Sequence, residues 1–418
     1  MIVLDNSFDK MDQLRCNAAM NPAATLSHAT VRAAWPVWLA GALALAVAMG
    51  VGRFAFTPLL PLMQREGLVG EAGGAALAAV NYAGYLLGAL SAARLAARPR
   101  RLVLASLLAT VLVTLAAGLV QSVAAWLLLR CAAGVFSAWV MVGVSAWAMG
   151  ELARRGRPEL GGRVYAGVGL GILLAGGLAW WRAGDGAAAL WLQLGLLALP
   201  AVLVVALAWP REVGAAATAA TRTGPAETGG HRGLVLSYGL FGFGYILPAT
   251  YLPAMARALV DDPRLFGLAW PAFGAAAALS TLATGWALRR HLARVWSVCH
   301  GMLAVGAALP LLSRSGPAIG AAALAVGGSF MVATMAGLQL ARQRAATNPA
   351  PLLSRMVASF AAGQIAGPLL VLLLAQLGVA RSIEATLALA ALLLLLSAVW
   401  LYRQSTPVSA ENDDARTR

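Results

Sequence analysis

Two arginines lie inside apolar stretches of the sequence, where a charged side chain is costly unless it has a partner. Arg53 stands within residues 50–61, and Arg130 stands within the apolar run 123–148. A guanidinium can bind a carboxylate or another oxyanion through two parallel hydrogen bonds. We predict that Arg53 binds or gates an anion, or else hydrogen-bonds to carbonyl groups at a helix end. Arg130 is predicted either to join Arg53 as a second cation or only to stabilise the helices around it.

Several other polar side chains interrupt apolar runs. Each could line a substrate cavity, and each could instead hydrogen-bond between packed helices. Asn81, Tyr245 and Gln364 are favoured for the cavity because they stand beside repeat-related glycine motifs. The predicted substrate-binding set is therefore Arg53, Arg130, Asn81, Tyr245 and Gln364.

The segment around Arg53 has a counterpart in the second half of the chain, at residues 242–253. Both copies keep two glycines and a final proline at a constant separation, whereas Arg53 is replaced by Tyr245. Proline removes a helical hydrogen bond and permits a kink, so these residues suit a moving gate or mark helix ends near a membrane boundary. The predicted gating residues are Gly50, Gly52, Pro58, Pro61, Gly242, Gly244, Pro248 and Pro253.

The composition places these motifs in a membrane protein. Hydrophobic residues make up 60% of the 418 positions and charged residues only 11%. A soluble domain could not bury that much apolar surface. Apolar runs of about 20 residues, long enough to cross a bilayer, lack the alternation of membrane β-strands. We predict an all-α membrane protein with twelve transmembrane helices at 34–63, 73–93, 102–121, 123–148, 163–182, 188–209, 233–257, 265–288, 295–313, 317–340, 354–378 and 381–402.

Residues 210–232 are rich in Ala, Thr and Gly, which is the composition of a linker. Six predicted spans precede this segment and six follow it, and the repeat makes the first span of each half equivalent. Two six-helix bundles around a central cavity are therefore predicted. The expected organisation is a cytoplasmic tail (1–33), an N-terminal bundle (34–209), a cytoplasmic linker (210–232), a C-terminal bundle (233–402) and a second cytoplasmic tail (403–418).

The net charge of +15 is a topology signal. Most of the 31 basic residues fall in the two tails and in every second gap between spans, which places both termini in the cytoplasm by the positive-inside rule. Residues 1–33 contain no apolar core of a signal peptide. The charge is spread over separate loops, so no nucleic-acid partner is expected. The predicted location is the cell inner membrane, with multiple passes.

The sequence contains no pattern that indicates catalysis, a metal site or a cofactor. Cys16, Cys131 and Cys299 have neither the spacing of a metal site nor that of a disulfide framework. There is no Walker loop, and no Asp or Glu lies in the interior of a predicted span. We therefore expect no enzyme activity, no metal and no cofactor, and the coupling ion stays open.

Three motifs carry a resemblance to a known family: GVGRFAFTPLLP at 50–61, NYAGYLLG at 81–88 and GVGLG at 167–171. The chain resembles the major facilitator superfamily over nearly its whole length, and within it the YbfB/YjiJ-type transporters. The resemblance implies the major facilitator fold, with two pseudo-symmetric six-helix bundles that give alternating access to a central site.

The general motifs of the superfamily are only partly present. The Arg-x-x-x-Gly pattern of the fourth span is kept from Arg130 to Gly134. Ala97 stands about where the family has an Asp that helps latch the two bundles, so the latch motif is incomplete in this chain. The fifth-span glycines lack the Gly-Pro of the antiporter motif, which weakens an assignment as an antiporter.

The predicted function is secondary active or facilitative transport of a small solute, with an organic anion as the favoured substrate. The alternative is a drug or metabolite exporter whose cavity is mainly apolar and whose arginines are structural. The expected partners are a small-molecule substrate and the lipid bilayer, and the expected state is a monomer.

Overall fold

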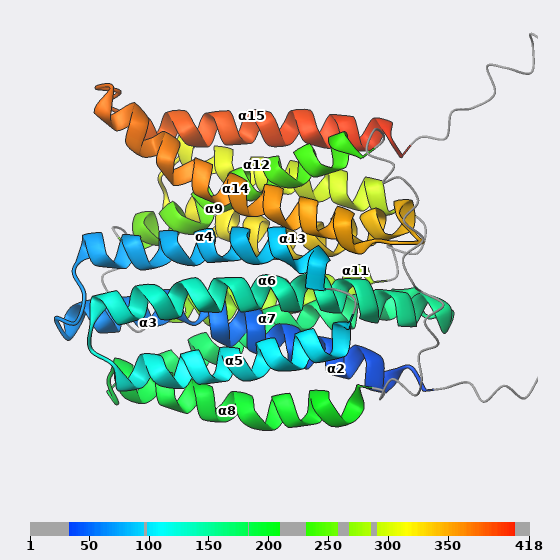
Figure 1. Ribbon diagram of the computed structural model, residues 1–418. Coiled ribbons are helices and arrows are strands. Elements are labelled where there is room, and N and C mark those ends of the chain that lie inside the picture. Colours follow the sequence, from blue (N-terminus) through cyan, green and yellow to red (C-terminus); the bar gives the residue numbers. More distant parts are fainter. Residues whose placement is uncertain are drawn as a thin grey trace, which may run out of the picture. The chain divides into compact units, whose positions relative to one another are not determined.

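Every regular element in the part of the chain that the structure describes is a helix (Figure 1). A helix satisfies its own backbone hydrogen bonds, which lipid cannot do for it. This computed structural model describes residues 33–95, 98–182, 184–209, 231–257, 267–285 and 291–405. Most of both predicted tails and of the predicted linker lie outside these ranges, and so does Ala97 of the degraded latch motif.

The first predicted span consists of three consecutive segments. They are α2 (Trp35–Leu45), the π-helix η1 (Ala46–Phe54) and α3 (Phe56–Arg65). Pro58 has no N–H, so the regular hydrogen-bond ladder cannot continue through this point. The π-helical segments of proteins are rare and occur frequently at functional sites. The irregular stretch of this span carries Arg53.

The remaining helices follow the predicted spans, with ends that differ by a few residues. They are α4 (Glu71–Leu95), α5 (Pro99–Leu119), α6 (Val123–Arg154), the 3₁₀-helix η2 (Pro158–Leu160), α7 (Gly161–Trp181), α8 (Ala187–Ala208), α9 (Arg232–Arg257), α11 (Ala269–Thr284), α12 (Leu292–Leu312), α13 (Gly316–Arg344), α14 (Ala350–Gln376) and α15 (Ser382–Arg403).

Eleven helices within the described ranges are long and apolar enough to cross a membrane. The eighth predicted span, 265–288, corresponds to α11, which has 16 residues. Residues 258–266 and 286–290, on either side of α11, lie outside the described part of the chain. The structure therefore describes eleven of the twelve predicted spans as helices long enough to cross a membrane, and it describes the eighth span only in part.

The described residues from Trp35 onward belong to the larger of two units, which begins at that residue. Within the larger unit, α5 and α8 lie at one side of the helix array and α12 and α15 at the other (Figure 1). The most extensive packing between the two halves of the sequence is that of α4 on α14 and of α7 on α11. The division into bundles at 34–209 and 233–402 stays a prediction.

Glycines allow neighbouring helices to approach closely, as expected where association in lipid depends on packing. A Cβ atom at Gly84 of α4 would lie 2.1 Å from the carbonyl oxygen of Cys131 on α6. A Cβ atom at Gly134 of α6 would lie 2.3 Å from the carbonyl oxygen of Asn81. The helix that carries Arg130 is therefore held close to α4 by contacts between backbones.

Candidate functional site

Arg53 lies between the two halves of the chain and is almost fully buried, with 3% of its surface exposed. Its Nη2 atom donates a hydrogen bond to Oε1 of Gln364 on α14. Gln364 is itself 1% exposed. The structure thus brings two of the predicted substrate-binding residues into direct contact, although they are 311 positions apart in the sequence.

Aromatic rings surround the Arg53 guanidinium. Its Cζ atom lies 4.0 Å from the ring centroid of Tyr85 and 5.5 Å from the centroids of Tyr82 and Phe54. A cation near the face of an aromatic ring is attracted by the ring's quadrupole. These contacts offset part of the cost of burying the charge, but they do not neutralise it.

The hydrogen-bonding capacity of Arg53 is only partly used. Its Nε and Nη1 atoms are buried without a partner among the described residues. Within the same part of the chain, none of the ion pairs that the structure shows includes Arg53. A buried guanidinium with two free donor atoms and no carboxylate beside it is chemically suited to an anionic ligand.

Arg130 binds backbone carbonyl groups. Its Nη1 atom donates to the carbonyl oxygens of Gly52 and Arg53, and its Nη2 atom donates to that of Arg53, all at 3.3 Å. Its Cζ atom also lies 4.4 Å from the ring centroid of Phe56. These contacts hold the end of η1 and favour the stabilising alternative for Arg130 over a second cation in the site.

A small cavity adjoins Arg130 on the side of the first half of the chain. It has a volume of about 20 Å³ and is lined in part by Gly52, Phe56 and Trp126. A volume of roughly 10–15 Å³ on this measure holds one water molecule. The cavity is therefore too small for an organic substrate, so it does not make Arg130 a substrate-binding residue.

Asn81 is fully buried and is connected to Arg53 through Arg130. Its Nδ2 atom donates to the carbonyl oxygen of Arg130 at 2.9 Å. This bond joins α4 to α6, which is the interhelical role that the sequence left open for Asn81. Asn81, Arg130 and Arg53 therefore form a connected series, in which Asn81 fixes the helix of Arg130 and Arg130 fixes the backbone of Arg53.

Tyr245 reaches the site through other aromatic rings. It is 2% exposed and stacks on Phe330, with ring centroids 5.0 Å apart. Phe330 in turn lies 6.5 Å from Phe54, the neighbour of Arg53. The residue that replaces Arg53 in the second copy of the repeat therefore belongs to an aromatic cluster beside the site.

The predicted gating glycines lie at close helix contacts. A Cβ atom at Gly50 would lie 2.4 Å from the Cα atom of Gly171 on α7, and one at Gly242 would lie 2.1 Å from the carbonyl oxygen of Phe360 on α14. A Cβ atom at Gly52 would lie 2.5 Å from Cγ2 of Thr110. One at Gly244 would lie 2.4 Å from Cδ1 of Leu394. These contacts favour a role in close packing, and a role in gate movement stays a prediction.

The predicted gating prolines lie in the second halves of the first and seventh spans. Pro58 and Pro61 are in α3, and Pro248 is buried in α9. Pro253 falls within α9, but its side chain lies outside the described part of the structure. The local change from π-helix to α-helix supports an irregular first span, while movement at these prolines stays a prediction.

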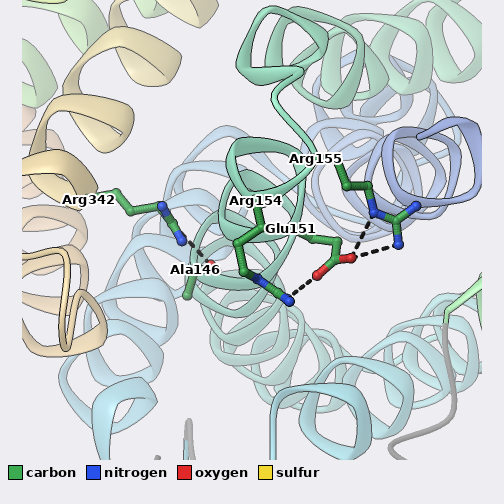
Figure 2. A network of polar contacts seen from close by, with 5 residues as sticks. All are labelled: Ala146, Glu151, Arg154, Arg155 and Arg342. Carbon is green, nitrogen blue, oxygen red and sulfur yellow. Dashed lines mark hydrogen bonds and ion pairs between the residues drawn. The ribbon is translucent and has the colours of Figure 1, made fainter. Parts of the chain in front are cut away.

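A second contact between the halves lies at the end of α13 that carries basic residues. Figure 2 shows Arg342 of α13 pointing toward α6, where its Nε atom donates to the carbonyl oxygen of Ala146 at 3.3 Å. A Cβ atom at Gly150 would lie 2.2 Å from Nη2 of Arg342, so the absent side chain leaves room for the guanidinium. On the same helix, Glu151 pairs with Arg154 and Arg155 (Figure 2). The hydrogen bond from Arg342 to Ala146 joins α6 of the first half to α13 of the second half.

The sequence did not predict the π-helix. It left Tyr82 and Tyr85 either lining the cavity or bonding between helices, and did not associate them with Arg53. Tyr82 and Tyr85 are three residues apart, so they lie on one face of a helix and could have been grouped. The π-helix has a weaker signal, namely the proline that follows two glycines. The position of Phe54 over the guanidinium depends on the π-helical register and has no separate signal in the sequence.

Comparisons with known proteins agree with this architecture. A family model described as "Uncharacterised MFS-type transporter YbfB" matches residues 45–402. No curated protein matches the chain in sequence. Among solved structures, the chain is similar to the crystal structure of the human organic anion transporter MFSD10 (TETRAN), with a TM-score of 0.64 and 17% identity. That alignment covers 88% of this chain and 99% of that one.

The match to the solved transporter supports the predicted two-bundle fold, and the family match spans most of the chain. The family match identifies a multi-pass membrane transporter rather than an enzyme. The chain belongs to the YbfB-type family of major facilitator superfamily transporters.

Proposed function

We propose that this transporter moves a small organic anion across the membrane by alternating access, and that Arg53 binds the oxyanion group of the substrate. The observation that supports this proposal most strongly is the buried Arg53 guanidinium, two of whose donor atoms have no partner among the described residues. An unpaired charge in an apolar interior costs several kcal/mol or more. A residue that carries such a cost is expected to have a function.

The surroundings of Arg53 favour a substrate with one oxyanion group and an apolar body. Arg130 uses both of its terminal nitrogens on the carbonyl groups of Gly52 and Arg53, and only its Nε lacks a partner among the described residues. Arg53 lacks partners at both Nε and Nη1, so it has more free donor capacity than Arg130. The rings of Tyr85, Tyr82 and Phe54 supply apolar surface next to that cation. A polyanion would place its remaining charges against these rings without compensation.

The contact between Arg53 and Gln364 connects substrate binding to movement of the two halves. Gln364 comes from α14 and Arg53 from η1, so their hydrogen bond joins the halves across the site. An arriving carboxylate binds a guanidinium more strongly than a neutral amide does. We infer that the substrate competes with Gln364 for Arg53 and thereby changes the free energy of the closed arrangement.

The similarity to a solved structure is consistent with this proposal. That structure is of a protein whose title names it as an organic anion transporter. At 17% identity the likeness supports the fold, and the substrate proposal rests on Arg53 itself.

We further propose that the chain lies in the cell inner membrane with both termini in the cytoplasm, works as a monomer and binds no nucleic acid. The distribution of basic residues supports the orientation. It also makes the α6–α13 contact the cytoplasmic closure. The bundles at 34–209 and 233–402, joined by a linker at 210–232, are the proposed moving parts.

Uptake into proteoliposomes tests the substrate site. Arg53→Ala is expected to lower uptake of a responsive organic anion by roughly 10- to 100-fold, because a hydrogen bond to a charged group contributes about 1.5–3 kcal/mol. The anion is first chosen by thermal shift from a panel of aromatic and aliphatic monocarboxylates, dicarboxylates, amino acids and cationic drugs. Arg355→Ala is the matched control, because Arg355 is exposed on α14 and hydrogen-bonds only to the carbonyl of Pro351 among the described contacts.

Normal uptake by Arg53→Ala would contradict the anion site. Stabilisation of the wild-type protein by lipophilic cations alone would favour the exporter alternative, in which the arginines are structural. A deletion strain with broad sensitivity to such cations would support the same alternative.

A further inference from the structure

A groove on the membrane-facing side of the first half has no role in the transport proposed above. It has a volume of about 460 Å³ and runs between α7 and α8, with α2 and η1 beneath it. Both α7 and α8 pack on α2 but touch each other little. A volume of this size falls within the roughly 300–1,000 Å³ of typical ligand sites.

The walls of the groove are almost entirely apolar, and its edges face outward. Leu170 and Leu174 of α7 and Leu197 of α8 lie along it with 50%, 47% and 49% of their surface exposed. In a membrane-spanning region, exposed leucines on the outer side of a helix contact lipid chains. The groove is therefore open to the acyl region of the bilayer.

One end of the groove carries a cation. Arg163 is the third residue of α7 and is exposed, and its Cζ atom lies 5.3 Å from the ring centroid of Trp38, which also lines the groove. Among the described residues, no carboxylate forms an ion pair with Arg163. Trp and Arg near helix ends are typical of the membrane interface, where lipid phosphates lie.

We propose that this groove binds a phospholipid with a negatively charged headgroup. One acyl chain lies between α7 and α8, and the phosphate contacts the guanidinium of Arg163. Basic sites between transmembrane helices at the cytoplasmic side are chemically suited to anionic headgroups. An apolar groove that ends at Arg163, which has no ion-pair partner in the described part of the chain, fits one molecule that has both an apolar chain and a negative group.

The floor of the groove connects the bound lipid to the transport site through the η1 helix. Ala46, Val47 and Val51 line it, and all three belong to η1, the segment that carries Arg53. A chain that fills the groove supports the outer face of this π-helix. The lipid is therefore placed to stabilise the irregular segment without touching the substrate.

Native mass spectrometry of the purified protein, titrated with phosphatidylglycerol or phosphatidylcholine, tests the proposal. Wild-type protein is expected to bind phosphatidylglycerol roughly tenfold more tightly, because one charge-assisted contact accounts for about that factor. Arg163→Gln should remove this preference. Arg101→Gln should keep it, because Arg101 is the exposed third residue of α5 and lies outside the groove.

A separate variant tests the part of the groove that is proposed to bind the acyl chain of the lipid. Ala201→Trp places a large ring in the groove from α8 and should weaken binding of both lipids by roughly tenfold or more. If this variant does not fold, as judged by gel filtration and thermal unfolding, Leu197→Ser at the exposed edge replaces it, with the same expectation.

Three results would overturn the proposal. The first is an unchanged headgroup preference in Arg163→Gln. The second is an equal loss in Arg101→Gln, which would indicate general surface charge. The third is unchanged lipid binding when the groove is filled. None of these measurements uses the transported substrate, so their failure leaves the proposal for Arg53 standing, and failure of that proposal leaves this one testable.

Discussion

At the scale of single residues, the two buried arginines differ in what their guanidinium groups bind. Arg130 binds the carbonyl oxygens of Gly52 and Arg53, which belong to the irregular end of η1. Among the described residues, Arg53 donates a hydrogen bond to Gln364, and its Nε and Nη1 atoms have no partner. We therefore infer that Arg130 is a positioning residue and that Arg53 is the group that meets the substrate.

The two arginines are expected to differ in their effect on stability. Arg130→Gln should lower the free energy of unfolding by about 1–3 kcal/mol, because buried carbonyl groups lose their donors. Arg53→Gln should leave that free energy unchanged or raise it, because it removes an unpaired buried charge and keeps a donor for Gln364. Thermal unfolding of both variants in detergent, followed by tryptophan fluorescence, measures the difference.

An equal loss of stability in the two variants would indicate that Arg53 is as structural as Arg130. Arg130→Lys provides a further control. Lysine keeps the charge but lacks the planar fork, so it cannot reproduce the shared contacts to two carbonyl groups. Its stability should therefore lie between those of the wild type and Arg130→Gln.

At the scale of helices, the contact between α7 and α11 joins the two halves through their backbones. A Cβ atom at Gly169 would lie 2.4 Å from the backbone nitrogen of Ala278 and 2.6 Å from the carbonyl oxygen of Gly274. Further along α7, Gly162 lies against Thr281 and Gly176 against Pro271. The two helices therefore pack closely over most of their length, and larger side chains at these glycines would separate them.

Gly169→Val should destabilise the protein by about 1–3 kcal/mol, because overpacking against backbone atoms cannot be relieved by a side-chain rotation. Gly177→Val is the matched control on the same helix, since a Cβ atom there meets nothing within 4 Å. Its effect should stay within about 0.5 kcal/mol. Melting temperatures compare the two variants, and equal values would show that the close α7–α11 packing contributes little.

At the scale of the whole molecule, the arrangement of charges determines the expected orientation. Arg154 and Arg155 at the end of α6, and Arg342 and Arg344 at the end of α13, lie at helix ends that we assign to the cytoplasm. Basic residues are retained on the cytoplasmic side of a membrane. An even number of crossings then returns the C-terminus to the side on which the chain began.

The orientation has a direct test. Green fluorescent protein fused after Arg418 should fluoresce, because this reporter matures in the cytoplasm. Alkaline phosphatase fused at the same point should be inactive, because this reporter requires export from the cytoplasm. Active phosphatase at this position would reverse the orientation. The α6–α13 contact would then close the outer end of the transporter.

The positions of the helices could be read from the sequence for a physical reason. The thickness of the bilayer fixes the length of an apolar run, so the observed helices differ from the predicted spans by only a few residues. The repeat of Gly50 and Gly52 at Gly242 and Gly244 also indicated shared helix geometry, and all four glycines lie at close contacts. These features depend on local composition and on spacing along the chain.

The sequence by itself thus determined the class of protein, the approximate helix ends and the identity of the buried arginines. Only the tertiary structure decided what each arginine binds. The partner of Arg53 is 311 positions away and the carbonyl groups bound by Arg130 are 77 and 78 positions away, so helix periodicity carries no information about them. The structure also revealed the π-helical segment η1, in which the carbonyl groups of Gly52 and Arg53 accept hydrogen bonds from Arg130 of another helix.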